Sequence, residues 1–114
     1  MKNKTVFVDI DTQFDFMDPC GNLYVPGAED IVDNVKKLFD YAQEHKIKIL
    51  SSMDAHTSDD PEFKLFPPHC IKGTPGNHKI EASTCNENII IENREQDITE
   101  SIMDHEQIIV ESQT

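Results

Sequence analysis

Apolar runs and helically spaced apolar positions alternate along the first half of the chain. Residues 5–8 with Ile10 form a β-branched and aromatic run, which is typical of a central parallel strand buried on both faces. A loop rich in Pro and Gly at residues 17–27 precedes apolar positions at helical spacing, namely Ile31, Val32, Val35, Leu38, Phe39 and Ala42. This helix should end near His45, and residues 47–50 should form a second strand. Together these elements predict a βαβ unit with a right-handed crossover.

The second half of the chain combines a long irregular segment with two further strands. Residues 53–76 show no periodic apolar pattern, and a long irregular segment inside a compact domain is usually functional. Apolar runs predict strands at residues 88–92 and 107–111, and residues 98–105 predict a short helix with Asp97 as its N-cap. The whole pattern predicts an α/β fold with a Rossmann-like parallel sheet and flanking helices.

The last predicted strand lies close to Thr114, the final residue of the sequence. A buried parallel strand needs a helix to cover it, and an open sheet edge favours aggregation. We therefore expect an incomplete sheet. The missing layer would come from self-association, from a complementing chain or from the rest of a longer protein.

The composition fits one domain, residues 1–114, with a modest hydrophobic core. Hydrophobic residues make up 37% of the chain, and Trp is absent, which limits the core. Ten Lys and Arg residues oppose 22 Asp and Glu residues, which gives a formal net charge of −12. Such a charge argues against nucleic acid or an anionic membrane as a partner, because both require a cationic surface.

The cysteines and the N-terminal residues indicate the cytoplasm. Cys20, Cys70 and Cys85 are an odd number without a C-x-x-C pair, so we expect free thiols in a reducing compartment. The first apolar run meets Asp9 and Asp11 too early for a secretory signal. No stretch has the length of a membrane span.

One carboxylate and two imidazoles of the irregular segment form a candidate metal site. Asp54 and His56 lie just beyond the second predicted strand, and ligands of parallel sheets bind beyond the carboxyl ends of the strands. His69, with prolines at the two preceding positions, completes a three-ligand set. This set suits a divalent metal, with Zn²⁺ expected first and Fe²⁺ or Mn²⁺ as alternatives. The competing interpretation is that all three are polar surface residues of the loop.

Glu62 lies between these candidates and has three interpretations. It is a fourth ligand, an outer partner that orients an imidazole, or a solvated carboxylate within the acidic residues 59–62, and we favour the last. His45, His78 and His105 have no such neighbours, so we expect all three at the surface.

Two aspartates close the first predicted strand. At that position Asp9 and Asp11 are well placed for proton transfer, although one of them is expected to be a cap or turn residue. Asp9-x-Asp11 after an apolar strand is similar to the first motif of haloacid dehalogenase-like phosphatases, and Ser51-Ser52 resembles the second. That resemblance implies Asp9 as the nucleophile and Asp11 as the acid/base, but it leaves the candidate metal site without a role.

Four parts of the chain together resemble the nicotinamidase and isochorismatase-like cysteine hydrolases. Residues 11–16 resemble the family's D-x-Q-x-D-F motif, and residues 21–28 resemble the stretch that follows it. Residues 51–56 resemble the metal-binding strand end, and residues 66–76 resemble W-P-x-H-C-x-x-G-T-x-G, the most specific match. Residues 108–114 resemble the strand that delivers the catalytic Lys. The matches cover nearly the whole chain but only about the first half of a family member.

The resemblance implies a role for each matching residue. Asp11 would be the carboxylate of the catalytic triad, and the metal ligands would be Asp54, His56 and His69. In the family a Cys thiolate attacks the carbonyl of nicotinamide or a similar small amide, ammonia leaves, and a thioester is hydrolysed. The metal there polarises or positions the pyridine nitrogen of the substrate.

Two departures from the family pattern bear on catalysis. Ser112 occupies the expected Lys position, and an uncharged side chain cannot lower a thiol pKa. No cysteine of the chain has the flanking residues of the nucleophile. We therefore expect a metal-containing amide hydrolase that is inactive as this chain alone. The alternatives are a non-catalytic metal-binding remnant of the family and the phosphatase described above.

Overall fold

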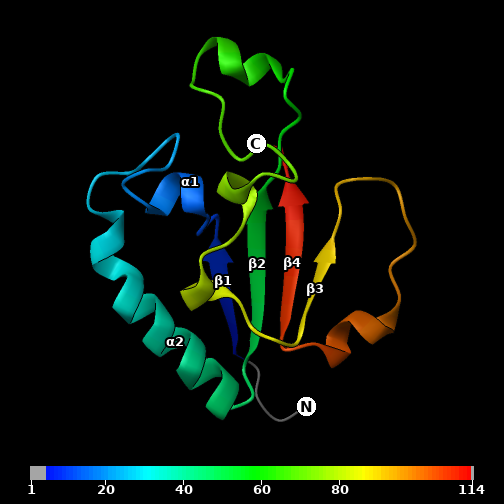
Figure 1. The fold of residues 1–114 in the computed structure, drawn as a ribbon. Helices are drawn as coiled ribbons and strands as arrows, with labels where there is room; N and C mark the ends of the chain where they lie inside the picture. Colours follow the sequence, from blue (N-terminus) through cyan, green and yellow to red (C-terminus); the bar gives the residue numbers. More distant parts are fainter. Residues whose placement is uncertain (1–4, 114) are drawn as a thin grey trace.

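Four parallel strands form the sheet in the computed structural model, which describes residues 5–113 (Figure 1). The strands are β1 (Val6–Ile10), β2 (Lys48–Asp54), β3 (Asn88–Ile91) and β4 (Gln107–Ser112), in the order β1-β2-β4-β3. All three pairs of neighbouring strands run parallel. The predicted α/β fold with an incomplete parallel sheet is therefore confirmed. The second strand continues four residues beyond its predicted end and includes Asp54.

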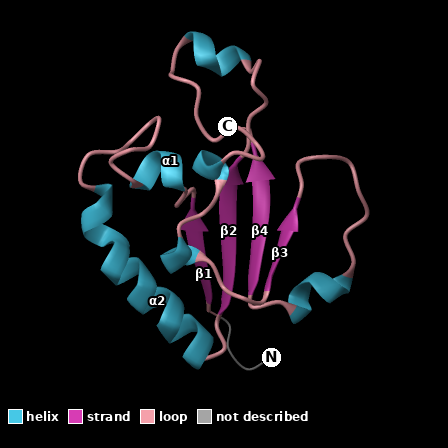
Figure 2. Cartoon of the chain, viewed as in Figure 1, coloured by secondary structure: helices cyan, strands magenta, loops and turns pink. Residues whose placement is uncertain are grey.

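Within residues 5–113, two α-helices and five short 3₁₀ segments connect the strands. Figure 2 shows the helical segments and strands in different colours. Helix α1 (Phe14–Met17) is a single turn, and α2 (Val32–Glu44) is the main helix. The predicted apolar stripe lies within α2 except for Ile31, which ends the preceding 3₁₀ segment, and no Gly or Pro interrupts the helix. Lys46, with a φ of 56°, reverses the chain after the helix, and the Ile47 N–H donates to the carbonyl of Ala42 at 2.8 Å. The 3₁₀ segments span Ala28–Ile31, Pro61–Lys64, Pro75–Asn77, Glu81–Ser83 and Glu100–Asp104.

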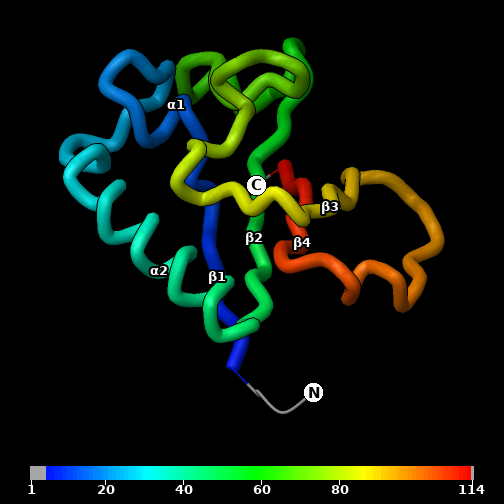
Figure 3. Tube along the Cα trace, turned by 60° about the horizontal axis from the view of Figure 1, so that its bottom comes forward, coloured from blue at the N-terminus to red at the C-terminus, as the bar shows by residue number. Residues whose placement is uncertain are grey.

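The hydrophobic core lies between α2 and one face of the sheet. Its buried members are Phe39, Ala42, Ile47, Ile49 and Cys85. Cys85 belongs to the segment that leads into β3, and in Figure 3 this segment crosses the sheet beside α2. Full burial of an Ile or Phe side chain stabilises the fold by about 1.5–3 kcal/mol. The core is small, as the composition predicted.

The opposite face of the sheet is open and apolar. The exposed fractions are 50% for Val6, 64% for Val8, 69% for Ile10, 41% for Leu50 and 38% for Val110. Side chains alternate between the two faces of a strand, so these residues point away from the layer that holds α2. The prediction of a first strand that is central and buried on both faces is wrong for this chain. In the described residues, β1 is an edge strand whose outward side chains have no covering layer.

The short helix predicted at residues 98–105 needs one correction. The segment before β4 forms a 3₁₀ helix at Glu100–Asp104, preceded by Thr99, so Asp97 is not its N-cap. None of the helices in residues 5–113 is long and apolar enough to cross a membrane.

Candidate metal centre

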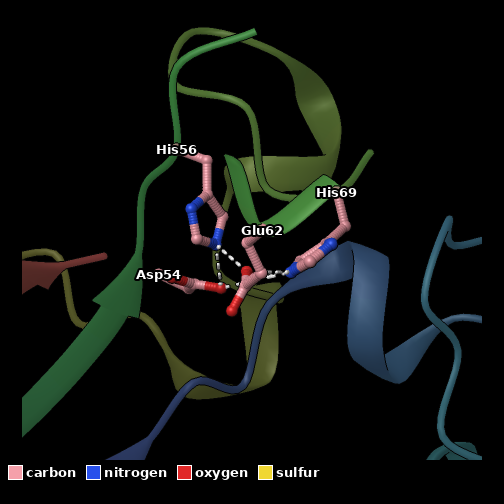
Figure 4. A group of neighbouring side chains, drawn as sticks. All are labelled: Asp54, His56, Glu62 and His69. Carbon is pink, nitrogen blue, oxygen red and sulfur yellow. Dashed lines mark hydrogen bonds and ion pairs between the residues drawn. The ribbon is translucent and has the colours of Figure 1, made fainter. Parts of the chain in front are cut away.

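Four side chains converge beyond the carboxyl end of β2 (Figure 4). Asp54 is the last residue of β2, and His56 follows two positions later. Glu62 comes from the 3₁₀ segment Pro61–Lys64, and His69 comes from the loop that follows it. One ligand atom from each of the four residues lies within 4.8 Å of all the others. The predicted convergence of one carboxylate and two imidazoles is therefore present in the structure, with Glu62 added.

The hydrogen bonds of the two imidazoles determine which ring nitrogen faces the centre. The Nδ1 atom of His56 lies 2.8 Å from Oδ2 of Asp60, and the Nδ1 atom of His69 lies 2.7 Å from the carbonyl oxygen of Pro67. Both partners are acceptors, so each Nδ1 carries the hydrogen. A neutral imidazole has only one N–H. In the neutral form of each ring, the Nε2 atom therefore presents a lone pair to the centre.

The centre contains acceptor atoms without the donors that would satisfy them. Nε2 of His56 lies 2.8 Å from Oδ2 of Asp54 and 2.9 Å from Oε2 of Glu62. Nε2 of His69 lies 3.5 Å and 3.4 Å from the same two oxygens. Oδ1 of Asp54 and Oε2 of Glu62 are buried without a hydrogen-bond donor. Buried carboxylate oxygens of this kind need either protons or a cation to balance their charge.

The pKa values of the buried groups reflect this crowding. Burial lowers the pKa of His56, but its hydrogen bonds to Asp60 and Asp54 outweigh burial, so the pKa is raised above 6.5. Burial raises the pKa of Asp54, although the neighbouring imidazoles oppose the shift. Without a cation, Asp54 and His56 therefore retain protons more strongly than free side chains do.

Gln13 holds the backbone of Asp54 in place. The fully buried Gln13 side chain donates from Nε2 to the Asp54 carbonyl at 2.7 Å and accepts from the Asp54 N–H at 2.8 Å. Asn77 donates to the same carbonyl from Nδ2 at 2.8 Å. These bonds give the Gln of the D-x-Q-x-D-F motif a structural role: Gln13 fixes the end of β2, where the candidate ligand Asp54 lies.

The next acidic residue of the motif holds the other side of the centre. Oδ2 of Asp15 accepts from the Cys70 N–H at 2.7 Å, and Oδ1 accepts from the Asn22 N–H at 3.0 Å. Cys70 follows His69 directly and has a φ of 50°, which is unusual for a residue other than glycine. A short polar motif after β1 therefore fixes two candidate ligands that lie far from it in the sequence.

Asp11 and Ser112 lie at the same end of the sheet but outside the four-residue group. The Ser52 hydroxyl donates to Oδ1 of Asp11 at 2.6 Å and accepts from the Asp11 N–H at 3.1 Å. Ser112, the last residue of β4, stands opposite Asp54 in the strand register, and its carbonyl accepts from the Ala55 N–H at 2.7 Å. Asp11 directly follows β1 and Ser112 ends β4, so both residues lie at the carboxyl ends of strands.

Asp9 points to the covered face of the sheet. Its Oδ2 accepts from Lys79 Nζ at 2.5 Å and from the Ser51 hydroxyl at 2.8 Å. The side chains of Asp9 and Lys79 are 8% and 2% exposed. Burial lowers the pKa of Lys79, although the charge of Asp9 opposes the shift. A phosphatase nucleophile must reach its substrate, so this buried ion pair contradicts the phosphatase alternative.

The remaining histidines and Glu62 show where the sequence was misleading. His45 and His78 are exposed as expected. His105 is half-buried, and its Nδ1 is buried without a hydrogen-bond partner, so its placement at the surface was wrong. The favoured interpretation of Glu62 as solvated was also wrong, because its carboxylate faces both imidazoles. Asp60 was missed, although an acidic residue before Pro is a recognisable helix-start signal.

The fold and the centre define the class of the molecule: an α/β protein with a carboxylate and imidazole centre at the carboxyl edge of a parallel sheet. Residues 5–101 match the family model of the isochorismatase domain. The chain therefore belongs to the isochorismatase family. A search of curated proteins finds no significant match.

Solved structures of family members share this fold. A pyrazinamidase of Pyrococcus horikoshii in complex with zinc is 24% identical, with a TM-score of 0.69 over 96% of this chain and 51% of the other. An isochorismatase-like hydrolase from Alkaliphilus metalliredigens is 23% identical, with a TM-score of 0.69 over 95% and 51%. A nicotinamidase/pyrazinamidase from Bacillus subtilis is 32% identical, with a TM-score of 0.62 over 68% and 45%. The chain spans about half the length of these structures.

Proposed function

We propose that this chain is the metal-binding half of a cysteine hydrolase that acts on nicotinamide or a similar small amide. Membership of the isochorismatase family supports the reaction class. The likeness to a nicotinamidase/pyrazinamidase from Bacillus subtilis supports an aromatic amide as the substrate. The single observation that carries the proposal is that one ligand atom from each of Asp54, His56, Glu62 and His69 lies within 4.8 Å of the others.

Zn²⁺ is the proposed metal, and the donor set fits it. Two neutral imidazole nitrogens and two carboxylates are ligand types that Zn²⁺ accepts, and one similar structure is a zinc complex. The buried oxygens of Asp54 and Glu62 without donors would become ligands. When bound, such a metal would position or polarise a substrate nitrogen or carbonyl. The ring of Phe16, whose centroid is 5.6 Å from that of His69, would form an apolar wall beside it.

Catalysis is proposed to require residues outside this chain. Burial raises the pKa of both Cys70 and Cys85, the latter to about 11, and a thiol nucleophile needs the opposite shift. Cys20 is exposed in the loop after α1. Asp11, oriented by Ser52, would be the carboxylate of the triad once a nucleophile is supplied. The non-catalytic metal-binding remnant remains the alternative, and the side chain of Ser112 favours it.

Further polypeptide, rather than a second copy, is proposed to cover the open face of the sheet. The five exposed apolar residues of this face lie on β1, β2 and β4, so any cover spans three strands. Similar structures contain about as many residues again. Two copies would bring together net charges of −12 each, which opposes self-association. Sedimentation velocity is expected to find a monomer, and a dimer at micromolar concentration would contradict this part of the proposal.

The metal proposal is tested by zinc titration of the metal-stripped protein against a chromophoric chelator. One equivalent is expected to bind, and both His56→Ala and His69→Ala should weaken binding at least tenfold. His78→Ala is the matched control, because His78 is exposed and outside the centre. Zinc binding that is unchanged by both substitutions would remove the site. Ammonia release from nicotinamide by this chain alone would contradict the proposal that catalysis needs further residues.

A further inference from the structure

Asp60 hydrogen-bonds two members of the candidate centre without belonging to it. Its Oδ2 accepts from Nδ1 of His56 at 2.8 Å, and its Oδ1 accepts from the Glu62 N–H at 2.8 Å. The Asp60 side chain is 14% exposed. The two oxygens of one carboxylate therefore bind two different residues, His56 and Glu62. The Nε2 atom of His56 and the Oε2 atom of Glu62 in turn lie 2.9 Å apart in the centre.

The local backbone explains how Asp60 reaches both partners. The Asp60 N–H donates to the Thr57 carbonyl at 3.2 Å, which turns the chain back toward His56. Asp60 is then the N-cap of the 3₁₀ segment that begins at Pro61, a residue that favours the first helical position. The cap fixes the direction of that segment, and the direction places the Glu62 side chain beside the two imidazoles.

The bond to His56 also has a chemical consequence. A carboxylate beside Nδ1 keeps the hydrogen on Nδ1, because a carboxylate only accepts. Nε2 of His56 is then free of hydrogen and available as a ligand. In proteins that bind metals through histidine, partners of this kind raise ligand basicity and orient the ring.

We propose that Asp60 is a positioning residue that arranges two ligands of the metal centre, His56 through its tautomer and Glu62 through the cap. This inference rests on the proposed metal centre. An Asn at this position would turn its NH₂ toward one of two donors. If the NH₂ faces Nδ1 of His56, the ring hydrogen moves to Nε2, the atom that faces the centre. If it faces the Glu62 N–H, the cap is lost.

The test measures zinc affinity for Asp60→Asn and for Asp59→Asn by chelator competition. Asp59 is the matched control, because it carries the same charge in the same loop, is exposed, and accepts from the Thr57 hydroxyl at 2.7 Å rather than from a member of the centre. Asp60→Asn is expected to weaken zinc binding about 10- to 100-fold, and Asp59→Asn less than twofold. The visible absorption bands of the cobalt-loaded protein should change for Asp60→Asn alone. Equal affinities and spectra for the two variants would overturn the inference.

Further measurements distinguish a positioning role of Asp60 from a general loss of folding and from failure of the proposed metal centre. Thermal unfolding of the metal-free Asp60→Asn protein should remain cooperative; if this variant does not fold, Asp60→Ser, which keeps an N-cap oxygen, is measured instead with the same expected loss. The double variant Asp60→Asn/Glu62→Gln should lose less zinc affinity than the product of the two single fold-losses, because both substitutions act on the same ligand. Multiplicative losses would overturn the role through Glu62. If the unsubstituted protein binds no zinc, the metal centre fails; if it binds zinc and Asp60→Asn binds equally well, only this inference fails.

Discussion

The carboxylate of Asp15 accepts a hydrogen bond from the main-chain N–H of Cys70 at 2.7 Å, across 55 positions of sequence. Asp15 lies in α1, and Cys70 follows the candidate ligand His69. The contact is buried, and the same carboxylate also accepts from the Asn22 N–H. It therefore ties the loop that carries one candidate ligand to the turn after β1. A mutation of Asp15 in α1 should therefore change the position of His69 in the metal centre.

Asp15→Ala is expected to lower the free energy of unfolding and to weaken zinc binding. Removing the acceptor leaves a buried N–H without a partner, which costs about 1–3 kcal/mol. The loop with His69 would also lose its anchor. Asp18→Ala is the control, since Asp18 makes a similar bond to the N–H of the exposed Cys20. Urea unfolding and zinc competition of both variants measure the effect, and equal losses in the two would argue against a special role for Asp15.

Gly76→Ala is expected to displace the Asp15 carboxylate. A Cβ atom at Gly76 would lie 2.1 Å from Oδ2 of Asp15, far closer than van der Waals contact allows. The substitution should therefore destabilise the protein by at least about 1 kcal/mol through overpacking. In an Asp15→Ala background the same change should cost much less, because the clash is gone. A double-mutant cycle by urea unfolding measures this, and strict additivity would show that the two residues do not meet.

Ile49 and Leu50 are neighbours on β2 that face opposite sides of the sheet. Ile49 is 1% exposed in the core, and Leu50 is 41% exposed on the open face. Ile49→Ala should lower the free energy of unfolding by about 2–5 kcal/mol, because it removes buried apolar surface and leaves a cavity. Leu50→Ala should lower it by less than about 1 kcal/mol. Denaturant unfolding compares them directly. A comparable loss for Leu50→Ala would mean that the open face is covered in solution, which favours self-association.

The three thiols should differ sharply in reactivity. Cys20 is exposed, whereas Cys70 and Cys85 are buried. With a pKa raised by burial to about 11, Cys85 would be thiolate in about one molecule in a thousand at about pH 8. Mass spectrometry after iodoacetamide treatment of the folded protein should therefore find a single modified residue, Cys20. Unfolding in urea should expose all three. Rapid labelling of Cys70 in the folded protein would contradict the buried loop.

The stabilisation by zinc should grow as the pH rises from about 6 to about 8. The pKa of His56 is raised above 6.5, mainly by Asp60 and Asp54 against the effect of burial. In the metal-free protein this proton stabilises the fold below pH 6.5, and that contribution is lost as the pH rises through the raised pKa. Zinc instead needs the deprotonated ring. The difference in Tm with and without zinc should therefore increase with pH, and a difference independent of pH would indicate binding away from His56.

The residue pattern was sufficient for the fold class, for most strands and for three members of the centre. Apolar runs identify strands and helical spacing identifies α2, because these depend on local periodicity. Asp54, His56 and His69 could be found because their residue types are ordinary metal ligands next to a strand end. Glu62 and Asp60 were placed wrongly or missed, since their role depends on the direction of a 3₁₀ turn that no periodicity encodes.

By itself the sequence determined that this is an acidic α/β chain with a parallel sheet and a histidine-containing loop after its second strand. Those properties follow from composition and from contacts between near neighbours along the chain. Only the tertiary structure decided that β1 is an edge with one open face, that Asp9 is locked to Lys79, and that Glu62 joins the centre. Each of these depends on pairing between distant segments, where strand order and side-chain burial are set by the whole packed molecule rather than by local pattern.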